Sequence, residues 1–144
     1  MNALTKGEHI LKLHQAMQSA IESKELTQIE CPVEHFFIGG MYARKIFIPA
    51  GATVVGAVHK KEHMTIALEG HCVVIDEIGD RKDVVAPCVF STEPGTQRAV
   101  YAVTDTSWLT VHVYDDEDKS LDTVKNALTC DTMEAYNRLL EAKV

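Results

Sequence analysis

The segment VHKKEHM places two histidines, His59 and His63, four residues apart, with Glu62 directly before the second. Imidazole nitrogens bind divalent transition metals, and a neighbouring carboxylate can act as a general base. On a helix, a spacing of four residues puts both rings on one face, which is the arrangement of a helical zinc site. The chemistry of this segment therefore depends on whether it forms a helix or the ends of two strands.

The residues on either side of the two histidines indicate strands. Thr-Val-Val-Gly-Ala-Val precedes His59, and Met-Thr-Ile-Ala-Leu follows His63. β-branched residues and glycine dominate these runs, and neither a helix cap nor an apolar period of 3.6 residues is present. We predict that His59 ends one strand, that residues 60–62 turn, and that His63 begins the next strand. This prediction excludes a zinc peptidase, whose metal-binding segment is helical.

Short apolar runs separated by turn residues continue through residues 33–114. HCVVIDEIGDRKDVVAP predicts a hairpin of two apolar strands around IGDRK. SWLTVHVY alternates, so that one face of this strand carries Trp108, Thr110, His112 and Tyr114. Many short strands at this spacing predict a mainly β protein, built as an antiparallel sandwich or barrel.

Helical periodicity is found on both sides of the β region. Residues 7–23 carry an apolar stripe of Ile10, Leu13, Met17, Ala20 and Ile21. LDTVKNAL and DTMEAYNRLLEA are the candidate C-terminal helices, and we expect Asp131 to cap the second in a capping box with Glu134. We therefore expect a single domain over residues 1–144, with an N-terminal helical segment (1–30), a barrel (33–114) and C-terminal helices (117–144).

The composition predicts a soluble, cytoplasmic protein. Its 144 residues fit one domain, and the 46% hydrophobic content argues against disorder. Of the net charge of −7, the DDED segment at residues 115–118 supplies four negative charges, so the remainder of the chain is only mildly acidic. No basic stripe predicts nucleic-acid binding, and no run approaches the roughly 20 apolar residues of a membrane span. The four cysteines form no C-x-x-C pair, so we expect reduced thiols.

Residues 33–114 resemble the cupin family. Gly51, His59 and Gly70 follow the spacing of its first motif, G-x5-H-x-H-x3,4-E-x6-G. Ala57 stands where the motif has its first histidine, and His63 stands where it has its glutamate. Two of the metal-ligand positions of the motif therefore carry a different residue type in this chain.

The second cupin motif, G-x5-P-x-G-x2-H-x3-N, is matched more loosely. Gly95 fits its inner glycine, whereas Arg98 and Ala102 hold the histidine and asparagine positions. The string HKKEH … EPGTQRAVYA … WLTVH is similar to short single-domain cupins encoded in bacteriophage genomes. The resemblance implies a cupin-like antiparallel β-barrel (jelly roll) with an N-terminal helix and one or two C-terminal helices.

In a cupin, alternate strand residues line the interior of the barrel, and this places the candidate site. The resemblance implies that His59, His63, Arg98 and His112 face one another there, and Thr65 follows two residues after His63. On the earlier strand MYARKIFI, two polar side chains share a face. The candidate ligand-binding residues are therefore Tyr42, Arg44, His59, His63, Thr65, Arg98 and His112.

Two chemical interpretations of this site remain open. In the first, His59, His63 and His112 bind one divalent metal, such as zinc, iron, nickel or manganese. In the second, Arg98 grips a carboxylate or phosphate without requiring a metal, because its guanidinium is always protonated and cannot ligate. An anion that lies between the metal and Arg98 would be consistent with both interpretations. Each histidine alone also fits a hydrogen-bonded core residue, and Arg98 fits an ion pair with one of the glutamates at 62, 69 and 93.

We therefore expect a small-molecule-binding cupin that holds a polar or anionic ligand, such as a nucleotide-like or sugar-phosphate metabolite. For a phage-encoded chain the location would be the host cytoplasm. The alternatives are a metal-dependent enzyme of the isomerase or dioxygenase type and a structural protein with a filled barrel. The sequence assigns no catalytic residue. Because cupins generally pair, the resemblance also implies a homodimer or higher homo-oligomer.

Overall fold

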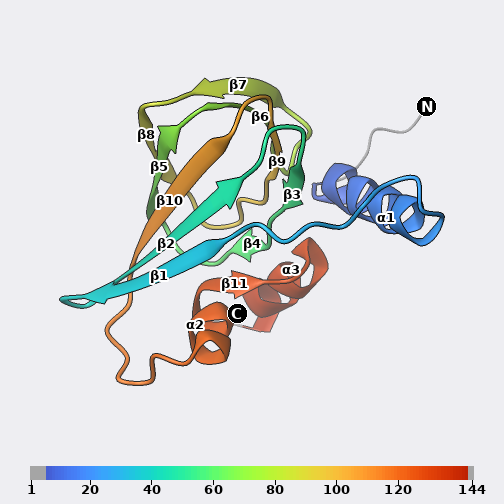
Figure 1. Ribbon diagram of the computed structural model, residues 1–144. Helices are drawn as coiled ribbons and strands as arrows, with labels where there is room; N and C mark the ends of the chain where they lie inside the picture. The colour runs from blue at the N-terminus through green and yellow to red at the C-terminus, as the bar shows by residue number, and fades with distance from the viewer. Residues whose placement is uncertain (1–5, 143–144) are drawn as a thin grey trace.

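Two antiparallel sheets face each other in the computed structural model, which describes residues 6–142 (Figure 1). The five-stranded sheet has the order β1-β2-β10-β5-β8 and comprises β1 (Val33–Ile38), β2 (Met41–Ile48), β10 (Thr106–Val113), β5 (His63–Glu69) and β8 (Cys88–Thr92). The four-stranded sheet has the order β3-β9-β6-β7 and comprises β3 (Thr53–Val55), β9 (Ala99–Ala102), β6 (His71–Ile75) and β7 (Arg81–Val85). The mainly β, antiparallel architecture predicted from the sequence is confirmed.

The hydrophobic core lies between the two sheets because the inward strand positions carry apolar side chains. Ile46, Ile48 and Trp108 come from the five-stranded sheet, and Val74 and Val100 come from the four-stranded sheet. Full burial of an aliphatic side chain of this size stabilises the fold by about 1.5–3 kcal/mol. Alternation along the strands thus holds the two sheets together and fixes which residues point inward.

The segment of the two histidines is extended, as predicted. The short strand β4 (Val58–His59) ends at His59, and β5 begins at His63. β4 pairs with β11 (Thr129–Cys130), so that His59 lies opposite Thr129 in a separate two-stranded sheet. The connection to the C-terminal region therefore holds His59 at one end of the barrel.

The predicted hairpin is also confirmed, since β6 and β7 pair antiparallel with His71 opposite Val85. Gly70 lies between β5 and β6, where the chain passes from the five-stranded to the four-stranded sheet. Its φ is 91°, and a Cβ at this position would stand 2.1 Å from the carbonyl oxygen of Asp105. Both the backbone conformation and the close approach require glycine here.

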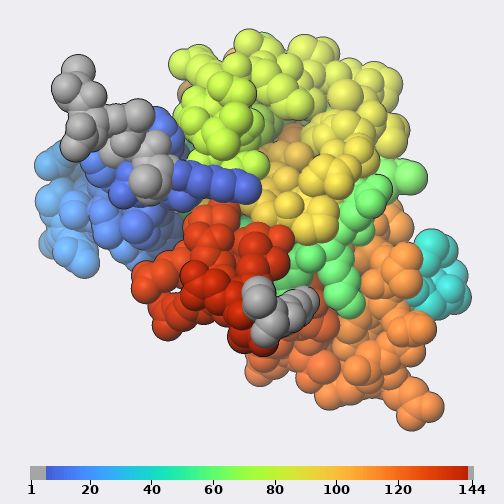
Figure 2. Space-filling view, turned by 180° about the vertical axis from the view of Figure 1, so that it is seen from behind, coloured from blue at the N-terminus to red at the C-terminus, as the bar shows by residue number. Residues whose placement is uncertain are grey.

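Helices flank the barrel at the predicted places: α1 (Glu8–Glu22), α2 (Leu121–Leu128) and α3 (Met133–Ala142). The Gly7 amide donates a hydrogen bond to the carbonyl of Glu77 (2.7 Å), which attaches the start of α1 to the β6–β7 turn. Figure 2 shows α3 in red beside α1 in blue, and Gly7 lies against Met133 at this contact. Residues 1–5 and 143–144 of the predicted helical segments lie outside the described residues.

The predicted cap of α3 is wrong by one residue. Thr132, not Asp131, caps the helix, because its Oγ1 accepts a hydrogen bond from the amide of Ala135 (3.1 Å). Glu134 consequently falls one position short of the place that a capping box requires. Asp131 instead forms an ion pair with Lys125 (3.4 Å). Threonine and aspartate are both good caps, so the local sequence does not distinguish them.

All four cysteines are free thiols, in agreement with the prediction of reduced cysteines. None of the helices in residues 6–142 combines the length and the apolar character needed to cross a bilayer.

Candidate metal centre and cavity

Three histidines from three different strands converge at one end of the barrel. His59 ends β4, His63 begins β5, and His112 lies near the end of β10. The ring centroids of His63 and His112 are 3.9 Å apart, those of His59 and His63 are 4.4 Å apart, and those of His59 and His112 are 6.0 Å apart. One nitrogen from each ring lies within 4.8 Å of the other two. The structure therefore brings together the three residues that the sequence singled out as candidate metal ligands.

A buried nitrogen of each ring has no hydrogen-bond partner among residues 6–142: His59 Nδ1, His63 Nε2 and His112 Nδ1. His63 Nδ1 lies 3.0 Å from the carbonyl oxygen of Lys61. Since a carbonyl only accepts, Nδ1 carries the proton and Nε2 keeps a free lone pair. Buried polar atoms are nearly always satisfied in folded proteins, so these three nitrogens are available to a ligand that the rings could share.

Burial keeps these imidazoles uncharged. Desolvation lowers the pKa of His59 to about 3, and the nearby His63, His112, Arg98 and Arg44 add to the shift. Desolvation, followed by His63 and Lys61, lowers the pKa of His112 to about 3. The pKa of His63 is lowered by burial and Arg98, against the opposing effect of the Lys61 carbonyl. Neutral imidazole is the form that binds a metal, so near pH 7 these rings need no deprotonation.

A cavity of about 390 Å³ opens inside the barrel beside the three histidines. Apolar side chains make much of its wall, including Ile46, Ile48, Val54, Val100 and Trp108. Helix α2 closes one side, contributing Leu121, Asp122, Val124, Lys125 and Leu128. A volume of this size, with apolar walls and a few polar groups, is typical of a small-molecule site.

Arg98 reaches the cavity from the four-stranded sheet. Its Nη1 donates a hydrogen bond to Thr92 Oγ1 (3.0 Å), and the guanidinium carbon lies 5.2 Å from the centre of the Phe90 ring. The Thr92 hydroxyl in turn lies 2.6 Å from that of Thr65, and both threonines are fully buried. Arg98 forms no ion pair with a carboxylate among residues 6–142, so the alternative pairing with a glutamate at 62, 69 or 93 is not found.

Arg44 and Tyr42 line the same cavity from β2, and so does His35 from β1. The Tyr42 hydroxyl and His35 Nδ1 are hydrogen-bonded at 2.7 Å. Arg44 also lacks an ion pair within the described part of the chain. Sequence analysis did not assign His35 to the site, although β1 pairs with β2 so that His35 lies directly opposite Arg44. A prediction that β1 pairs with β2 would have placed His35 at the cavity.

The other candidate residues lie outside the cavity wall. His63 and Thr65 are not among the residues that line the cavity, and Thr65 lies behind it, bound to Thr92. Lys60, a neighbour of the histidines, bonds through its ammonium to the carbonyl of Asn126 at the end of α2. This contact joins the turn of residues 60–62 to the helix that closes the cavity.

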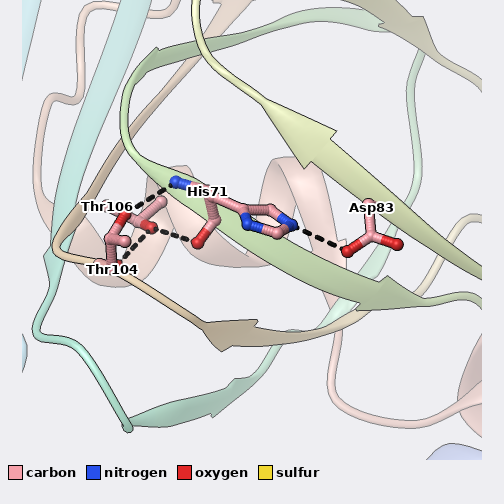
Figure 3. A network of polar contacts seen from close by, with 4 residues as sticks. All are labelled: His71, Asp83, Thr104 and Thr106. Atoms are coloured by element: carbon pink, nitrogen blue, oxygen red, sulfur yellow. Dashed lines mark hydrogen bonds and ion pairs between the residues drawn. The ribbon is translucent and has the colours of Figure 1, made fainter.

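His71 lies in a separate polar network at the start of β6 (Figure 3). Its Nε2 is hydrogen-bonded to Asp83 Oδ1 (2.7 Å) across the β6–β7 hairpin. Its amide donates to Thr104 Oγ1 (2.9 Å), and its carbonyl accepts from Thr106 Oγ1 (3.4 Å). Because these contacts engage Nε2 of its ring and both polar groups of its backbone, His71 is a structural residue of the hairpin.

Comparison with known proteins identifies the fold. No protein-family model matches the sequence, and no curated protein matches it significantly. A cupin superfamily protein of Desulfitobacterium hafniense is similar in structure, with a TM-score of 0.52 and 12% identity over 62% of this chain and 83% of that one.

An RmlC-like cupin with a double-stranded β-helix fold, from Methanocaldococcus jannaschii, gives a TM-score of 0.51 and 10% identity over 60% of this chain and 82% of that one. Ectoine synthase from P. lautus gives a TM-score of 0.50 and 11% identity over 60% of this chain and 65% of that one. At these identities the similarity establishes architecture alone. In its fold, this chain is a cupin-like jelly roll.

Proposed function

We propose that the protein binds a polar or anionic small molecule in the barrel cavity, with one divalent metal ion held by His59, His63 and His112. The observation that carries this proposal is the convergence of the three rings: one nitrogen of each lies within 4.8 Å of the other two, and each ring has a buried nitrogen without a hydrogen-bond partner among the described residues. Three lone pairs gathered in a desolvated site repel one another unless a shared cation meets them. A proton is a poor candidate, because burial lowers the pKa of all three rings.

The chemistry of the donors supports a borderline transition metal. Imidazole nitrogen suits zinc, iron, nickel and manganese, and three histidines are sufficient protein ligands for a catalytic zinc site. The hydrogen bond from His63 Nδ1 to the Lys61 carbonyl is the kind of outer contact that orients a metal-binding imidazole. A metal bound here would act as a Lewis acid toward an oxygen atom of the ligand.

The charge inside the cavity supports an anionic ligand, because Arg44, Arg98 and Lys125 line it against one carboxylate, Asp122, among the described residues. Arg44 lies on β2 and Arg98 directly before β9 in the facing sheet, and neither forms an ion pair with a carboxylate among residues 6–142. Removing a guanidinium from water costs free energy that an anion recovers. These cations would repel a divalent ion unless an anion lies between them. At an effective dielectric constant near 20, two unit charges 4 Å apart repel each other by about 4 kcal/mol.

The size and polarity of the cavity narrow the class of ligand. About 390 Å³ accommodates a small metabolite, and the apolar wall around Trp108 suits a ring or a short carbon skeleton. A nucleotide-like or sugar-phosphate molecule combines such a skeleton with a phosphate for Arg98. A filled barrel, the structural alternative, would lack a cavity of this volume.

A metal-dependent enzyme is the second candidate, and the low number of protein ligands favours it. Three histidines leave metal positions for substrate or water, as in catalytic zinc sites. Ectoine synthase, one of the structurally similar proteins, carries an enzyme's name. Glu62 is exposed and does not line the cavity, whereas Asp122 of α2 does, so Asp122 would be the candidate general base of such an enzyme.

Elemental analysis of the purified protein tests the metal. We expect about one zinc, iron, nickel or manganese ion per chain by plasma mass spectrometry, and its loss in His59→Ala and His63→Ala. His71→Ala is the matched control, because His71 bonds to Asp83 outside the cavity and should keep the metal. Failure of the wild-type protein to bind any of these four ions in titrations would contradict the proposal.

A thermal-shift screen with inorganic phosphate, sugar phosphates and nucleoside monophosphates tests the anion. A ligand at about 100 times its Kd stabilises a protein by about 2.7 kcal/mol. Arg98→Ala should abolish that stabilisation, whereas Arg138→Ala, which removes a surface arginine paired with Glu134, should not. An unchanged response in Arg98→Ala would exclude anion binding by Arg98 while leaving the metal result standing.

A further inference from the structure

Two guanidiniums line the barrel cavity without an ion pair, although they come from different sheets. Arg44 is on β2 of the five-stranded sheet, and Arg98 directly precedes β9 of the four-stranded sheet. Both side chains are partly buried, and neither meets a carboxylate within residues 6–142. The proposed function assigns a phosphate to Arg98 but no ligand group to Arg44.

The strand register places the two guanidiniums at opposite ends of one row of inward side chains. Arg44 on β2 lies opposite Thr110 on β10. The row continues through Thr65 on β5 to Phe90 on β8, and the Arg98 guanidinium carbon lies 5.2 Å from the centre of the Phe90 ring. Three strand spacings of about 4.8 Å separate β2 from β8, so the row is about 14 Å long. The two cations therefore mark two separate places in the cavity.

Each end of this row carries further polar groups. At the Arg44 end, His35 lies directly opposite on β1 and is hydrogen-bonded to the Tyr42 hydroxyl (2.7 Å). At the other end, Arg98 uses Nη1, one of several donor nitrogens, to bond to Thr92 Oγ1 (3.0 Å). The next inward positions along the strands of Arg44, Thr110 and Arg98 are apolar: Ile46, Trp108 and Val100. The lining therefore suits a carbon skeleton with a charged group at each end.

The charge of the cavity fits two anionic groups better than one. Lys125 also lines it, but its ammonium forms an ion pair with Asp131 (3.4 Å). Asp122 is the one carboxylate of the lining among the described residues, and it is exposed. Two guanidiniums thus face one carboxylate, and a divalent ion on the histidines would add to the positive charge. A single anion would leave one guanidinium desolvated without a partner.

We propose that the cavity binds a doubly anionic small molecule, with a carboxylate or phosphate at each end of a short carbon skeleton. This inference rests on the proposed anion binding and extends it, since one end bonds to Arg98 and the other to Arg44. Each guanidinium can hold such a group through two parallel N–H bonds. Because the skeleton joins the two groups, binding of one raises the effective concentration of the other at its arginine.

The two ends of the ligand would both lie near the histidine cluster. Burial is the main reason that the pKa of His59 is lowered to about 3, and His63, His112, Arg98 and Arg44 add to the shift. Both guanidiniums therefore act on the same imidazole. A ligand that neutralises them would also reduce their repulsion of a cation held by the three rings.

Isothermal titration with a series of ligands tests the two-ended molecule. Linear dicarboxylates of about four to eight carbon atoms, which are shorter than the row of about 14 Å, are compared with monocarboxylates of the same length. Fructose bisphosphate is compared with fructose monophosphate in the same way. We expect one dicarboxylate, or the bisphosphate, to bind at least about 10-fold more tightly than its counterpart with one anionic group. Equal affinities in every pair would overturn the proposal.

Arginine variants test whether Arg44 holds the second anionic group. In Arg44→Ala, Arg44→Gln and Arg98→Ala, the preferred two-ended ligand should bind at most about 3-fold more tightly than its one-ended counterpart, because only one end is held. Lys45→Ala is the matched control, since Lys45 follows Arg44 on β2 but lies 4.0 Å from Glu34 and does not line the cavity. The proposal is wrong if the Arg44 variants keep the full difference or if Lys45→Ala loses it.

The same measurements separate this inference from the proposed function. If inorganic phosphate stabilises the wild-type protein through Arg98 but one-ended and two-ended ligands bind equally, anion binding stands and the second subsite at Arg44 is wrong. If neither phosphate nor any ligand of the series binds, both proposals fall.

Discussion

The two faces of the five-stranded sheet are built from the same strands and carry opposite chemistry. On β10, His112 and Thr110 point inward while Val111 and Val113 point outward, and on β5 His63 points inward while Met64 points outward. In a sheet with one solvated face, the apolar residues normally face the core and the polar residues face water. Around the histidine cluster, this sheet reverses that pattern.

The reversal has an energetic consequence on each face. Polar groups directed into a barrel are costly unless they are satisfied, so the unsatisfied imidazole nitrogens indicate a ligand. Apolar groups directed outward are costly while they remain in water. Deeper in the barrel, at Ile46, Ile48 and Trp108, the usual apolar interior returns and provides the stability of the fold.

The largest effect is expected from a substitution on the inner face, at His112. His112→Ala removes one of three candidate metal ligands, and we expect the metal affinity to fall by at least about 100-fold, more than the loss of an outer-shell contact usually costs. Competition with a chromophoric chelator measures it. Val113→Ala changes the next residue of β10, which points outward, and should leave the metal affinity unchanged. Equal losses in both variants would mean that the two faces do not differ in function.

The next largest effect, on the stability of the fold, is expected at Gly70, where the chain passes from the five-stranded to the four-stranded sheet. Gly70→Ala places a Cβ against the Asp105 carbonyl at a positive φ, and we expect a loss of more than about 2 kcal/mol in the free energy of unfolding. Urea denaturation measures this. Gly39→Ala is the comparison, because a Cβ there meets nothing within 4 Å and only its φ of 54° is unfavourable. A Gly70→Ala variant as stable as Gly39→Ala would contradict the clash.

The sequence predicted those features of the two sheet faces that depend on the local pattern of residues. The alternation of residues 107–114 and the strand ends at His59 and His63 follow from side-chain period and turn residues, which neighbouring residues decide. The apolar outer face of the five-stranded sheet was not recognised, because exposure depends on which strands become neighbours and on what covers them. Nor did the sequence predict that α2 closes one side of the cavity.

Two contacts at the cavity were also not predicted from the sequence, for the same physical reason. His35 joins the cavity through the pairing of β1 with β2, and Arg98 is bound by Thr92 from another strand. The partners are close in sequence, but each contact depends on how the chain turns between them, which no periodicity in the sequence reports. The cap of α3 differs for the opposite reason: Asp131 and Thr132 are adjacent and equally suitable, and the packing of the helix selects between them.

An intermediate effect is expected from pH on the metal-free protein. The pKa of His59 and that of His112 lie near 3 in the folded chain, against about 6.5 in the unfolded chain. The unfolded state therefore binds more protons between these values, and stability falls as the pH drops from about 6.5 toward 3, by up to about 1.4 kcal/mol per pH unit for each ring. Urea melts in chelator at several pH values measure this slope.

The matched variant for the pH series is His59→Gln/His112→Gln, which removes both inner-face titrations. Its stability should depend less on pH below about 6.5 than that of the wild type. An outer-face variant, Val113→Thr, should retain the full slope because it changes no titrating group. If all three proteins lose stability in parallel, the acid sensitivity comes from other groups and the inner imidazoles are not held neutral by burial.

The smallest effect is expected at Thr92, which supports the inner face without lining the cavity. Thr92→Val keeps the shape of the side chain but removes the acceptor of the Arg98 hydrogen bond, so the guanidinium loses a fixed orientation. We expect the affinity for inorganic phosphate to fall about 3- to 10-fold, which corresponds to the net worth of a typical hydrogen bond. Isothermal titration measures it, with the metal affinity as the internal reference.

The double variant Thr65→Val/Thr92→Val separates orientation of Arg98 from simple loss of stability. Thr92→Val alone leaves the buried Thr65 hydroxyl without its partner, which costs about 1–3 kcal/mol, whereas replacing both threonines removes the unsatisfied group. The double variant should therefore regain stability but keep the weakened phosphate affinity. If phosphate affinity recovers together with stability, Thr92 serves only the packing between β5 and β8, and Arg98 is oriented by its contact with Phe90.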